Sequence, residues 1–231
     1  MKVLKYKDAE ETCSQLAAYI QDRITVATTK HKQFFLCLSG GNTPKLLYEK
    51  LADKIIDWSN VHIFFGDERV VPFESEQNNA RMATIALLSK IKIPKQNIHP
   101  IITELQVNEA VDNYEQELRK IFVNPDHTFD MVLAGLGDDG HTLSLFPGAS
   151  IEKNKWVQLT KKTGEAIFRI TLTPSIINAS AEVIFLVTGN NKAEMVKNVA
   201  VDKNQACPAS LIQPLSKNMS WFVDEQAGKY L

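Results

Sequence analysis

The chain has 231 residues, and its 26 lysines and arginines nearly balance its 27 aspartates and glutamates. This length suffices for one large α/β domain with a full core, and the balanced charge gives no reason to expect nucleic acid or an anionic membrane as a partner. No apolar run approaches the roughly 20 residues of a membrane span, and the start of the chain lacks the apolar centre of a secretion signal.

Short strand-like runs alternate with helical periods along the chain. In chain order, the pattern predicts a helix over 9–24, a strand over 33–38, a helix over 44–51, a strand over 61–65, a helix over 80–88, a helix over 111–121, a strand over 131–134, strands over 167–171 and 183–188, a helix over 192–201 and a strand over 219–223. This alternation predicts an α/β fold with a largely parallel, twisted sheet and helices on both faces. Because no linker-like segment divides the chain, we expect a single domain over residues 1–231.

The run from Phe129 to Gly148 is the most informative stretch, because a buried strand ends there in a glycine-rich turn. That turn carries two carboxylates and an imidazole, those of Asp138, Asp139 and His141. Ligands of α/β proteins bind at the carboxyl ends of strands, and histidine changes its charge near neutral pH. The turn is therefore predicted to form part of a catalytic site.

The same turn formally spells the dinucleotide fingerprint G-x-G-x-x-G over residues 135–140. A pyrophosphate would face the like charges of Asp138 and Asp139, and the acidic residue expected about 20 residues later is missing. Phe146-Pro147-Gly148 also cuts short any following helix. We therefore expect no nucleotide here. A metal on this turn is also disfavoured, because its carboxylates and His141 share no metal-binding spacing.

A second glycine turn, over residues 39–44, follows the strand at 33–38. Its glycines let the backbone approach a ligand closely, while Thr43 is a natural N-cap and Pro44 a natural first helical residue. Free N–H groups at a helix start attract phosphate, although an ordinary capped helix would look the same. The candidate phosphate-binding residues are Gly40, Gly41, Asn42 and Thr43.

Further charged candidates lie after the predicted strand at 61–65, within the one at 167–171 and after the one at 183–188. Asp67-Glu68-Arg69 comes directly after the strand at 61–65, where such a triplet is usually a solvated loop but here should leave the same edge of the sheet. Arg169 and Lys192 could each neutralise a phosphate dianion. The alternative for both is ordinary solvation at the surface.

The cysteines and the remaining histidines point to no further chemistry. The three cysteines are scattered, so neither a disulfide framework nor a zinc site is expected, and we expect reduced thiols in the cytosol. No G-x-S-x-G elbow of a serine hydrolase is present. The histidines outside the turn share no spacing; they are His31, His62, His99 and His127.

These segments, in this order, resemble the 6-phosphogluconolactonase family. The motifs that carry the resemblance span nearly the whole chain: Ser39-Gly-Gly-Asn-Thr-Pro44, Asp67-Glu-Arg-Val-Val-Pro72, Gly135-Leu-Gly-Asp-Asp-Gly-His-Thr-Leu-Ser-Leu-Phe-Pro147, Arg169-Ile-Thr-Leu-Thr173, Gly189-Asn-Asn-Lys-Ala193, Pro208-Ala-Ser210 and Trp221-Phe-Val-Asp224. The resemblance implies a Rossmann-like fold, shared with glucosamine-6-phosphate deaminase. It also implies hydrolysis of 6-phosphogluconolactone in the oxidative pentose phosphate pathway, without metal or organic cofactor.

The resemblance favours the lactonase over the deaminase. Deaminases carry a Glu five residues after the histidine of their Asp-Gly-His motif, where this chain has Phe146. The triplet at residue 67 also follows the lactonase pattern. A non-catalytic sugar-phosphate sensor is a third reading, for which the chain has no spare length to hold a DNA-binding segment. The chain departs from the family pattern at Asp138, where Pro or Ser is common, and at Leu143, where Ala is usual.

Chemistry and resemblance together suggest the roles of the site residues. His141 would take a proton from water, oriented by Asp139 or Asp67, and Asp67 is the alternative base. Arg69 or backbone N–H groups would stabilise the oxyanion. The turn at 40–43, with the basic residues Arg169 and Lys192 beside it, would hold the 6-phosphate. The only partner expected is the small-molecule substrate, in a monomer or a homodimer.

Overall fold

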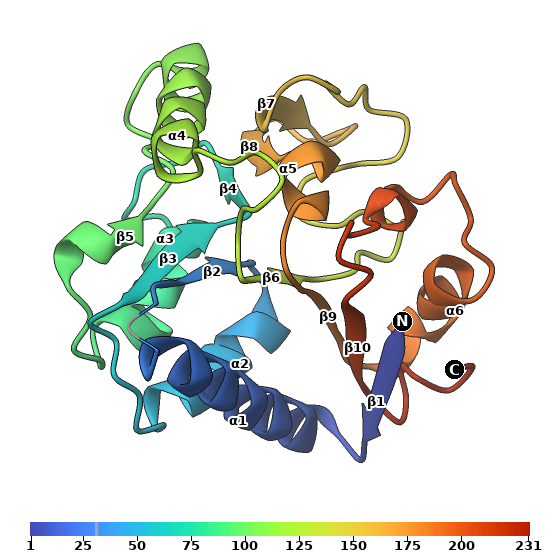
Figure 1. Cartoon of the computed structure of the whole chain (residues 1–231). Helices are drawn as coiled ribbons and strands as arrows, with labels where there is room; N and C mark the ends of the chain where they lie inside the picture. The colour runs from blue at the N-terminus through green and yellow to red at the C-terminus, as the bar shows by residue number, and fades with distance from the viewer. Residues whose placement is uncertain (31) are drawn as a thin grey trace.

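A computed structural model describes residues 1–30 and 32–231, so His31 lies outside the described residues. Their centre is a seven-stranded parallel sheet in the order β1-β10-β9-β6-β2-β3-β5 (Figure 1). Its strands are β1 (Lys2–Tyr6), β2 (Phe34–Leu38), β3 (Val61–Phe65), β5 (Ile98–His99), β6 (Met131–Ala134), β9 (Val183–Val187) and β10 (Met219–Asp224). The predicted α/β fold with a largely parallel sheet is confirmed.

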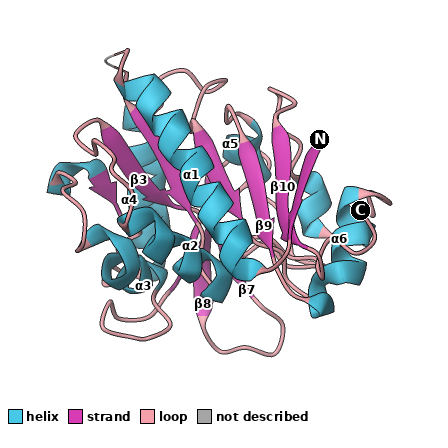
Figure 2. Cartoon of the chain, turned by 90° about the horizontal axis from the view of Figure 1, so that it is seen from below, coloured by secondary structure: helices cyan, strands magenta, loops and turns pink. Residues whose placement is uncertain are grey.

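Helices cover both faces of this sheet. The α-helices are α1 (Ala9–Thr28), α2 (Asn42–Ala52), α3 (Asn79–Ala83), α4 (Val107–Ile121), α5 (Pro174–Asn178) and α6 (Ala193–Ala200). Figure 2 shows α1 and α2 across one face, where Phe222 of β10 packs 5.7 Å from the ring of Tyr19. Neighbouring strand residues point to opposite faces, so Trp221 faces the other side, towards α6.

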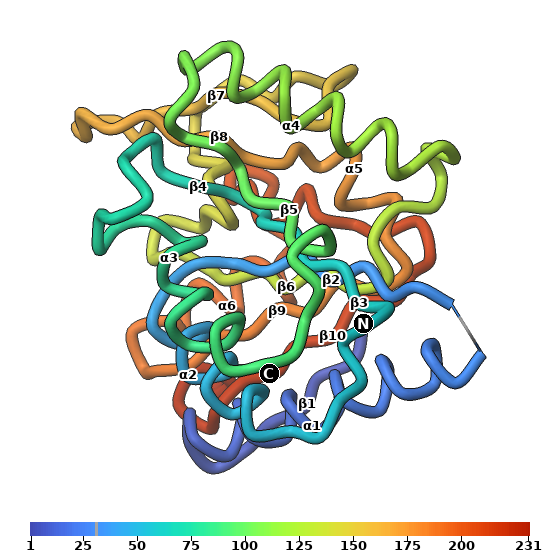
Figure 3. Tube along the Cα trace, turned by 90° about the vertical axis from the view of Figure 1, so that its left-hand side faces the viewer, coloured from blue at the N-terminus to red at the C-terminus, as the bar shows by residue number. Residues whose placement is uncertain are grey.

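A separate three-stranded antiparallel sheet has the order β4-β8-β7. Its strands are β4 (Asp67–Arg69), β7 (Val157–Lys161) and β8 (Phe168–Leu172). Figures 1 and 3 both place it on one side of the large sheet, with α4 beside β7. The Arg119 guanidinium of α4 lies 4.4 Å from the Trp156 ring centroid at this contact.

The small sheet is the main departure from the sequence prediction. The run at 167–171 is a strand, but it pairs antiparallel with β4 and β7 rather than joining the parallel sheet. The predicted helix over 80–88 begins as α3 and continues as a π-helical segment, η1 (Thr84–Leu88). Strand β1 escaped prediction because it is a mostly exposed edge strand with no buried apolar face.

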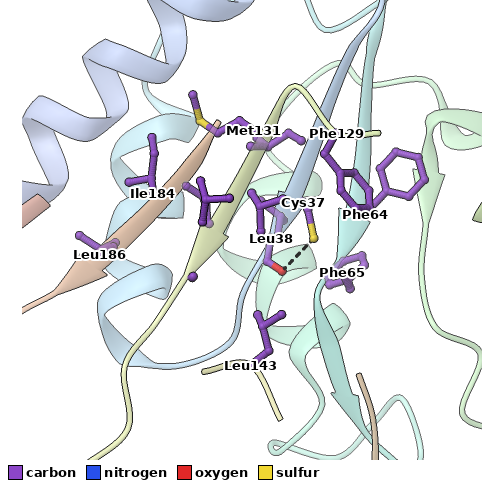
Figure 4. Close-up of a cluster of buried hydrophobic side chains, with 14 of the residues drawn as sticks. Cys37, Leu38, Phe64, Phe65, Phe129, Met131, Leu143, Ile184 and Leu186 are labelled. Carbon is purple, nitrogen blue, oxygen red and sulfur yellow. Dashed lines mark hydrogen bonds between the residues drawn. The ribbon is translucent and has the colours of Figure 1, made fainter. Parts of the chain in front are cut away.

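Leu143 anchors the turn after β6 in the hydrophobic core. Figure 4 shows it beneath Leu38 and Phe65, at the ends of β2 and β3, and a Cβ on Gly66 would lie only 2.7 Å from its side chain. Its φ of 51° is unusual for a bulky residue. Core packing therefore holds the strained backbone of Leu143 in place, two residues after His141. Backbone strain of this kind is found most often close to functional sites.

The remaining short helical segments join these layers. They are the 3-10 helices η2 (Lys95–Asn97), η3 (Asn190–Lys192) and η4 (Pro208–Leu211). None of the helices among the described residues combines the length and the apolar character that a membrane span requires.

Candidate active site

One pocket of about 570 Å³ opens where the loops after β2, β6 and β9 meet the small sheet. Adjacent parallel strands end at one edge of a sheet, so their loops converge there. All ten residues singled out from the sequence line this pocket: Gly40, Gly41, Asn42, Thr43, Asp67, Arg69, Asp139, His141, Arg169 and Lys192.

His141 is held against Asp139 within the turn after β6. Its Nδ1 hydrogen-bonds the Asp139 carboxylate, and its backbone N–H donates to the same oxygen at 3.1 Å. A Cβ on Gly137 would lie 2.0 Å from Nδ1, so only glycine leaves room for the ring. With Nδ1 engaged as a donor, Nε2 is the nitrogen that can accept a proton.

Asp139 remains ionised in this setting. Partial burial opposes its charge, but hydrogen bonds from His141 and the positive charge of Lys162 outweigh it and lower the pKa of the carboxyl. The Lys162 ammonium lies 3.9 Å from the other carboxylate oxygen. The ring of Phe146 supports His141 from behind, with the centroids 5.1 Å apart.

The charged triplet at residue 67 is strand β4 rather than a solvated loop. Asp67 is only 7% exposed, and it accepts a hydrogen bond at 2.5 Å from the hydroxyl of Ser144. Asn79 donates to the Asp67 backbone carbonyl at 3.0 Å. Burial raises the pKa of Asp67, although Ser144 and the nearby arginines oppose the shift. The sequence predicted a loop at this edge of the sheet, and the structure has a strand with Asp67 buried in place of the solvated alternative.

Glu68 points the opposite way and is fully buried. Its carboxylate accepts three backbone N–H groups at 2.8 Å each, from Arg69, Asn79 and Ala80. Burial nevertheless raises its pKa to about 7. Glu68 thus ties β4 to the start of α3 and fixes Asn79, which in turn holds Asp67.

The turn after β2 starts helix α2, but not with the predicted cap. Gly41, with a φ of 114°, is the N-cap residue and offers no side chain. Thr43 lies inside the first helical turn, and its hydroxyl pairs with that of Thr188 at 2.9 Å instead. The first N–H groups of a helix have no intrahelical acceptor. Those of Asn42 and Thr43 therefore form a positive wall of the pocket.

Two arginines face each other across the small sheet. Arg69 of β4 is the cross-strand partner of Arg169 of β8, an arrangement of like charges that is unfavourable unless an anion lies nearby. Here Glu165 supplies that anion, with its carboxylate 2.5 Å from the Arg169 guanidinium. The hydrogen bond from Arg169 lowers the pKa of Glu165. An adjoining hollow of about 650 Å³ also borders both arginines, together with Lys45.

Lys192 is likewise engaged by a carboxylate. Its ammonium lies 2.7 Å from Asp138, which also accepts a hydrogen bond at 3.2 Å from Asn191. Asp138 is one of the positions at which the chain departs from the family pattern. Each of the two predicted phosphate-binding cations therefore has an internal carboxylate partner.

Sequence reasoning missed four residues that shape the site: Asn79, Ser144, Lys162 and Glu165. Asn79 and Ser144 contact Asp67 from other elements, and nothing in the local pattern signals such contacts. Lys162 and Glu165 lie in the loop before β8, whose position depends on antiparallel pairing with β4. Among the described residues, no cluster of three or more His, Cys, Asp or Glu side chains could hold a metal ion.

Comparison with known proteins gives a consistent result. A family model described as glucosamine-6-phosphate isomerases/6-phosphogluconolactonase matches residues 7–221. The 6-phosphogluconolactonase of Synechocystis sp. is 40% identical over 220 residues, which cover 92% of this chain and 90% of that protein.

Solved structures agree in fold. The crystal structure of 6-phosphogluconolactonase from Thermotoga maritima is 31% identical and aligns with a TM-score of 0.82, covering 96% of this chain and 99% of that one. A monomeric glucosamine-6-phosphate deaminase is 19% identical and aligns with a TM-score of 0.86 over the whole of both chains, and so shares the fold.

Proposed function

The chain belongs to the glucosamine-6-phosphate isomerase/6-phosphogluconolactonase family, and from that premise we propose that its pocket opens 6-phosphogluconolactone with His141 as general base. One observation carries the proposal. The His141–Asp139 pair and the cross-strand pair of Arg69 and Arg169 line the same pocket of about 570 Å³. A base and an anion-binding surface are the two features that hydrolysis of a phosphorylated lactone requires.

The reaction proceeds in two proton transfers. Nε2 of His141 takes a proton from water as the water oxygen bonds to the lactone carbonyl carbon. Asp139 stabilises the resulting imidazolium through Nδ1–H. Collapse of the tetrahedral oxyanion breaks the bond to the ring oxygen, which receives the proton back from His141. The product is 6-phosphogluconic acid, which releases its carboxyl proton to solvent to give 6-phosphogluconate, and the enzyme is unchanged.

Positive groups around the pocket stabilise the oxyanion and bind the phosphate. Arg69, next to Asp67 on β4, stabilises the tetrahedral oxyanion. The 6-phosphate lies on the N–H groups at residues 40–43, which begin α2, between Arg169 and Lys192. Phosphate binding then replaces the internal carboxylates that hold these two cations in the structure. The anchored phosphate fixes the lactone carbonyl against His141.

Phe146 argues against the deaminase as a second candidate. It is buried, with the His141 ring 5.1 Å away on one side and the Arg169 guanidinium 5.3 Å from its centroid. A carboxylate at this position would add a proton-carrying group beside the base. The phenyl ring instead supports His141 and Arg169, the proposed base and a proposed phosphate-binding residue, by packing alone.

We also propose the domain, the compartment and the partner in which and with which the reaction takes place. Residues 1–231 act as one lactonase domain, because both sheets contribute side chains to one pocket. The cytosol is the proposed compartment, since the three cysteines are buried free thiols. The substrate is the only proposed partner, and a monomer and a homodimer are both compatible with the pocket.

The test is the opening of freshly generated 6-phosphoglucono-δ-lactone, with EDTA present, measured against its spontaneous hydrolysis. We expect loss of the lactone far above background, and no ammonia from glucosamine 6-phosphate in a parallel assay. Folded protein that leaves the lactone at its background rate would overturn the proposal, and ammonia release would identify a deaminase.

A further inference from the structure

The end of β10 carries a buried carboxylate that the proposed reaction does not use. This residue, Asp224, is only 5% exposed and does not line the active pocket. Burial of a carboxylate is costly unless hydrogen bonds compensate for the lost water. The partners of Asp224 therefore indicate what it contributes to the fold.

The Asp224 carboxylate holds the turn that follows β9. Its two oxygens accept the backbone N–H of Gly189, at 2.9 and 3.1 Å, and one of them accepts the N–H of Ala227 at 2.7 Å. Strand β10 lies beside β9 in the sheet (Figure 2), with Val223 opposite Val187, so Asp224 reaches just past the end of β9. Hydrogen bonds to a carboxylate are roughly twice as strong as neutral ones. This contact therefore fixes the start of the turn.

The same turn presents Lys192 to the active pocket. Gly189 is the N-cap residue of η3, with a φ of 99° that favours glycine, and its carbonyl accepts the backbone N–H of Lys192 at 3.1 Å. The preceding residue, Thr188, pairs with the Thr43 hydroxyl of α2 at 2.9 Å. Lys192 thus begins from a backbone that α2 holds on one side and Asp224 on the other.

We infer that Asp224 is a positioning residue for the substrate phosphate and that it acts through Gly189 and Lys192. The inference rests on the proposed function, because it takes Lys192 as a ligand of the 6-phosphate. Lysine is a point charge on a flexible stem, so the place of its backbone sets where the ammonium can meet the phosphate. A misplacement of about 1 Å costs a large part of such a contact.

The test is a double-mutant cycle on the binding of 6-phosphogluconate to the full chain, measured by calorimetry. Asp224→Asn keeps the shape of the side chain but removes its charge and one acceptor oxygen. It should weaken binding about three- to tenfold, the worth of one hydrogen bond. In the Lys192→Ala background the same substitution should change the affinity by less than about twofold, because the ammonium that Asp224 positions is gone.

Turnover of the lactone gives a second readout. Asp224→Asn should raise KM by a factor similar to its effect on binding, and it should change kcat by less than about threefold. A general loss of structure would lower kcat as well, so the split between KM and kcat separates positioning from instability.

Asp130→Asn is the matched control. Asp130 also accepts a backbone N–H, that of Phe35 at 2.8 Å, but it precedes β6, at the opposite end of that strand from the catalytic turn. Its substitution should leave the affinity for 6-phosphogluconate unchanged.

Gly189→Ala replaces Asp224→Asn if that variant does not fold. It keeps the carboxylate and disturbs the same turn from the other side, because a φ of 99° strains any residue with a Cβ. It should show the same loss of affinity and the same dependence on Lys192.

Two results would overturn the inference in a chain that still hydrolyses the lactone. Equal weakening by Asp224→Asn with and without the Lys192 side chain would show that the effect does not pass through Lys192. Unchanged affinity in folded Asp224→Asn would show that the turn needs no carboxylate. A wild-type chain that neither opens the lactone nor binds 6-phosphogluconate would instead overturn the proposed function, and the inference with it.

Discussion

Strand β4 and the turn after β6 each carry two adjacent carboxylates beside the pocket, and the two pairs behave in opposite ways. Asp67 and Glu68 of β4 are buried, and burial raises the pKa of both. The side chains of Asp138 and Asp139 are 70% and 40% exposed. Hydrogen bonds from His141 outweigh partial burial and lower the pKa of Asp139.

Under the proposed function, carboxyl groups take two different roles in this site. In β4, loss of solvent dominates, and the carboxylates act through fixed hydrogen bonds that hold Asn79 and Ser144. In the turn, partners dominate, and Asp139 stays charged beside His141. Groups whose environments push their pKa values apart commonly divide the roles of a site. We therefore assign the moving proton to the turn and the framework to β4.

The largest predicted effect is a fall in kcat on substitution of His141 in the turn after β6. His141→Ala should lower kcat by about 10²- to 10⁴-fold, the usual worth of general base catalysis, because in the proposed mechanism His141 accepts the proton of the attacking water. Steady-state hydrolysis of the lactone measures this. His127→Ala, an exposed histidine outside the pocket, is the control and should match the wild type.

The raised pKa of Glu68 in β4 can be tested by measuring the stability of the protein instead of its reaction rate. Its pKa of about 7 lies above the ordinary value of 4.5, so between these values the folded protein holds a proton that the unfolded chain releases. Stability therefore falls as pH rises through this window. Relative to Glu68→Gln, the wild type should lose about 3 kcal/mol of unfolding free energy between pH 4.5 and 7.5.

Urea unfolding of both proteins across this range measures the difference. The variant loses an acceptor for the backbone N–H groups, so its absolute stability is not the readout. Parallel pH dependences of the two proteins would show that folding does not raise the pKa of Glu68, and would remove the contrast between β4 and the turn.

Arg169 should affect binding more than turnover. Arg169→Ala should raise KM by about ten- to a hundredfold, the worth of a charged hydrogen bond, while kcat changes by less than about threefold. Lys192→Ala should behave similarly, with Lys92→Ala as the unaffected control. A fall in kcat without a rise in KM would place these residues at the carbonyl instead of the phosphate.

The smallest effect is expected at Asp138, which competes with the substrate phosphate for Lys192. Asp138→Asn should lower KM by about two- to fivefold at low salt, the range of exposed ion pairs, and leave kcat unchanged. Asp202→Asn is the matched control, because it frees Lys197 from a similar pair at 2.6 Å outside the pocket. An unchanged or higher KM in Asp138→Asn would contradict the competition.

The parts of the site that local sequence could predict are those built from one segment. The strand at 131–134 is buried throughout, so its run of apolar residues predicted it correctly. The turn that follows carries both His141 and its partner Asp139, so one segment predicted the pair. The N-cap at Thr43 was mistaken because Gly41 supplies the conformation that starts α2. Local patterns do not encode how distant segments pair. They therefore could not predict the contacts of Asn79 and Ser144 with Asp67, or that Arg69 and Arg169 lie opposite each other on paired strands.

Chemical rescue of His141→Ala by imidazole tests the central claim most directly. With 6-phosphogluconate binding shown to be intact, added imidazole should restore turnover in proportion to its free base, above its own reaction with the lactone. 1-Methylimidazole should rescue less, because it has no N–H to donate to Asp139. Near wild-type kcat in His141→Ala, or no rescue in a variant that still binds, would contradict the account and make Asp67 the base.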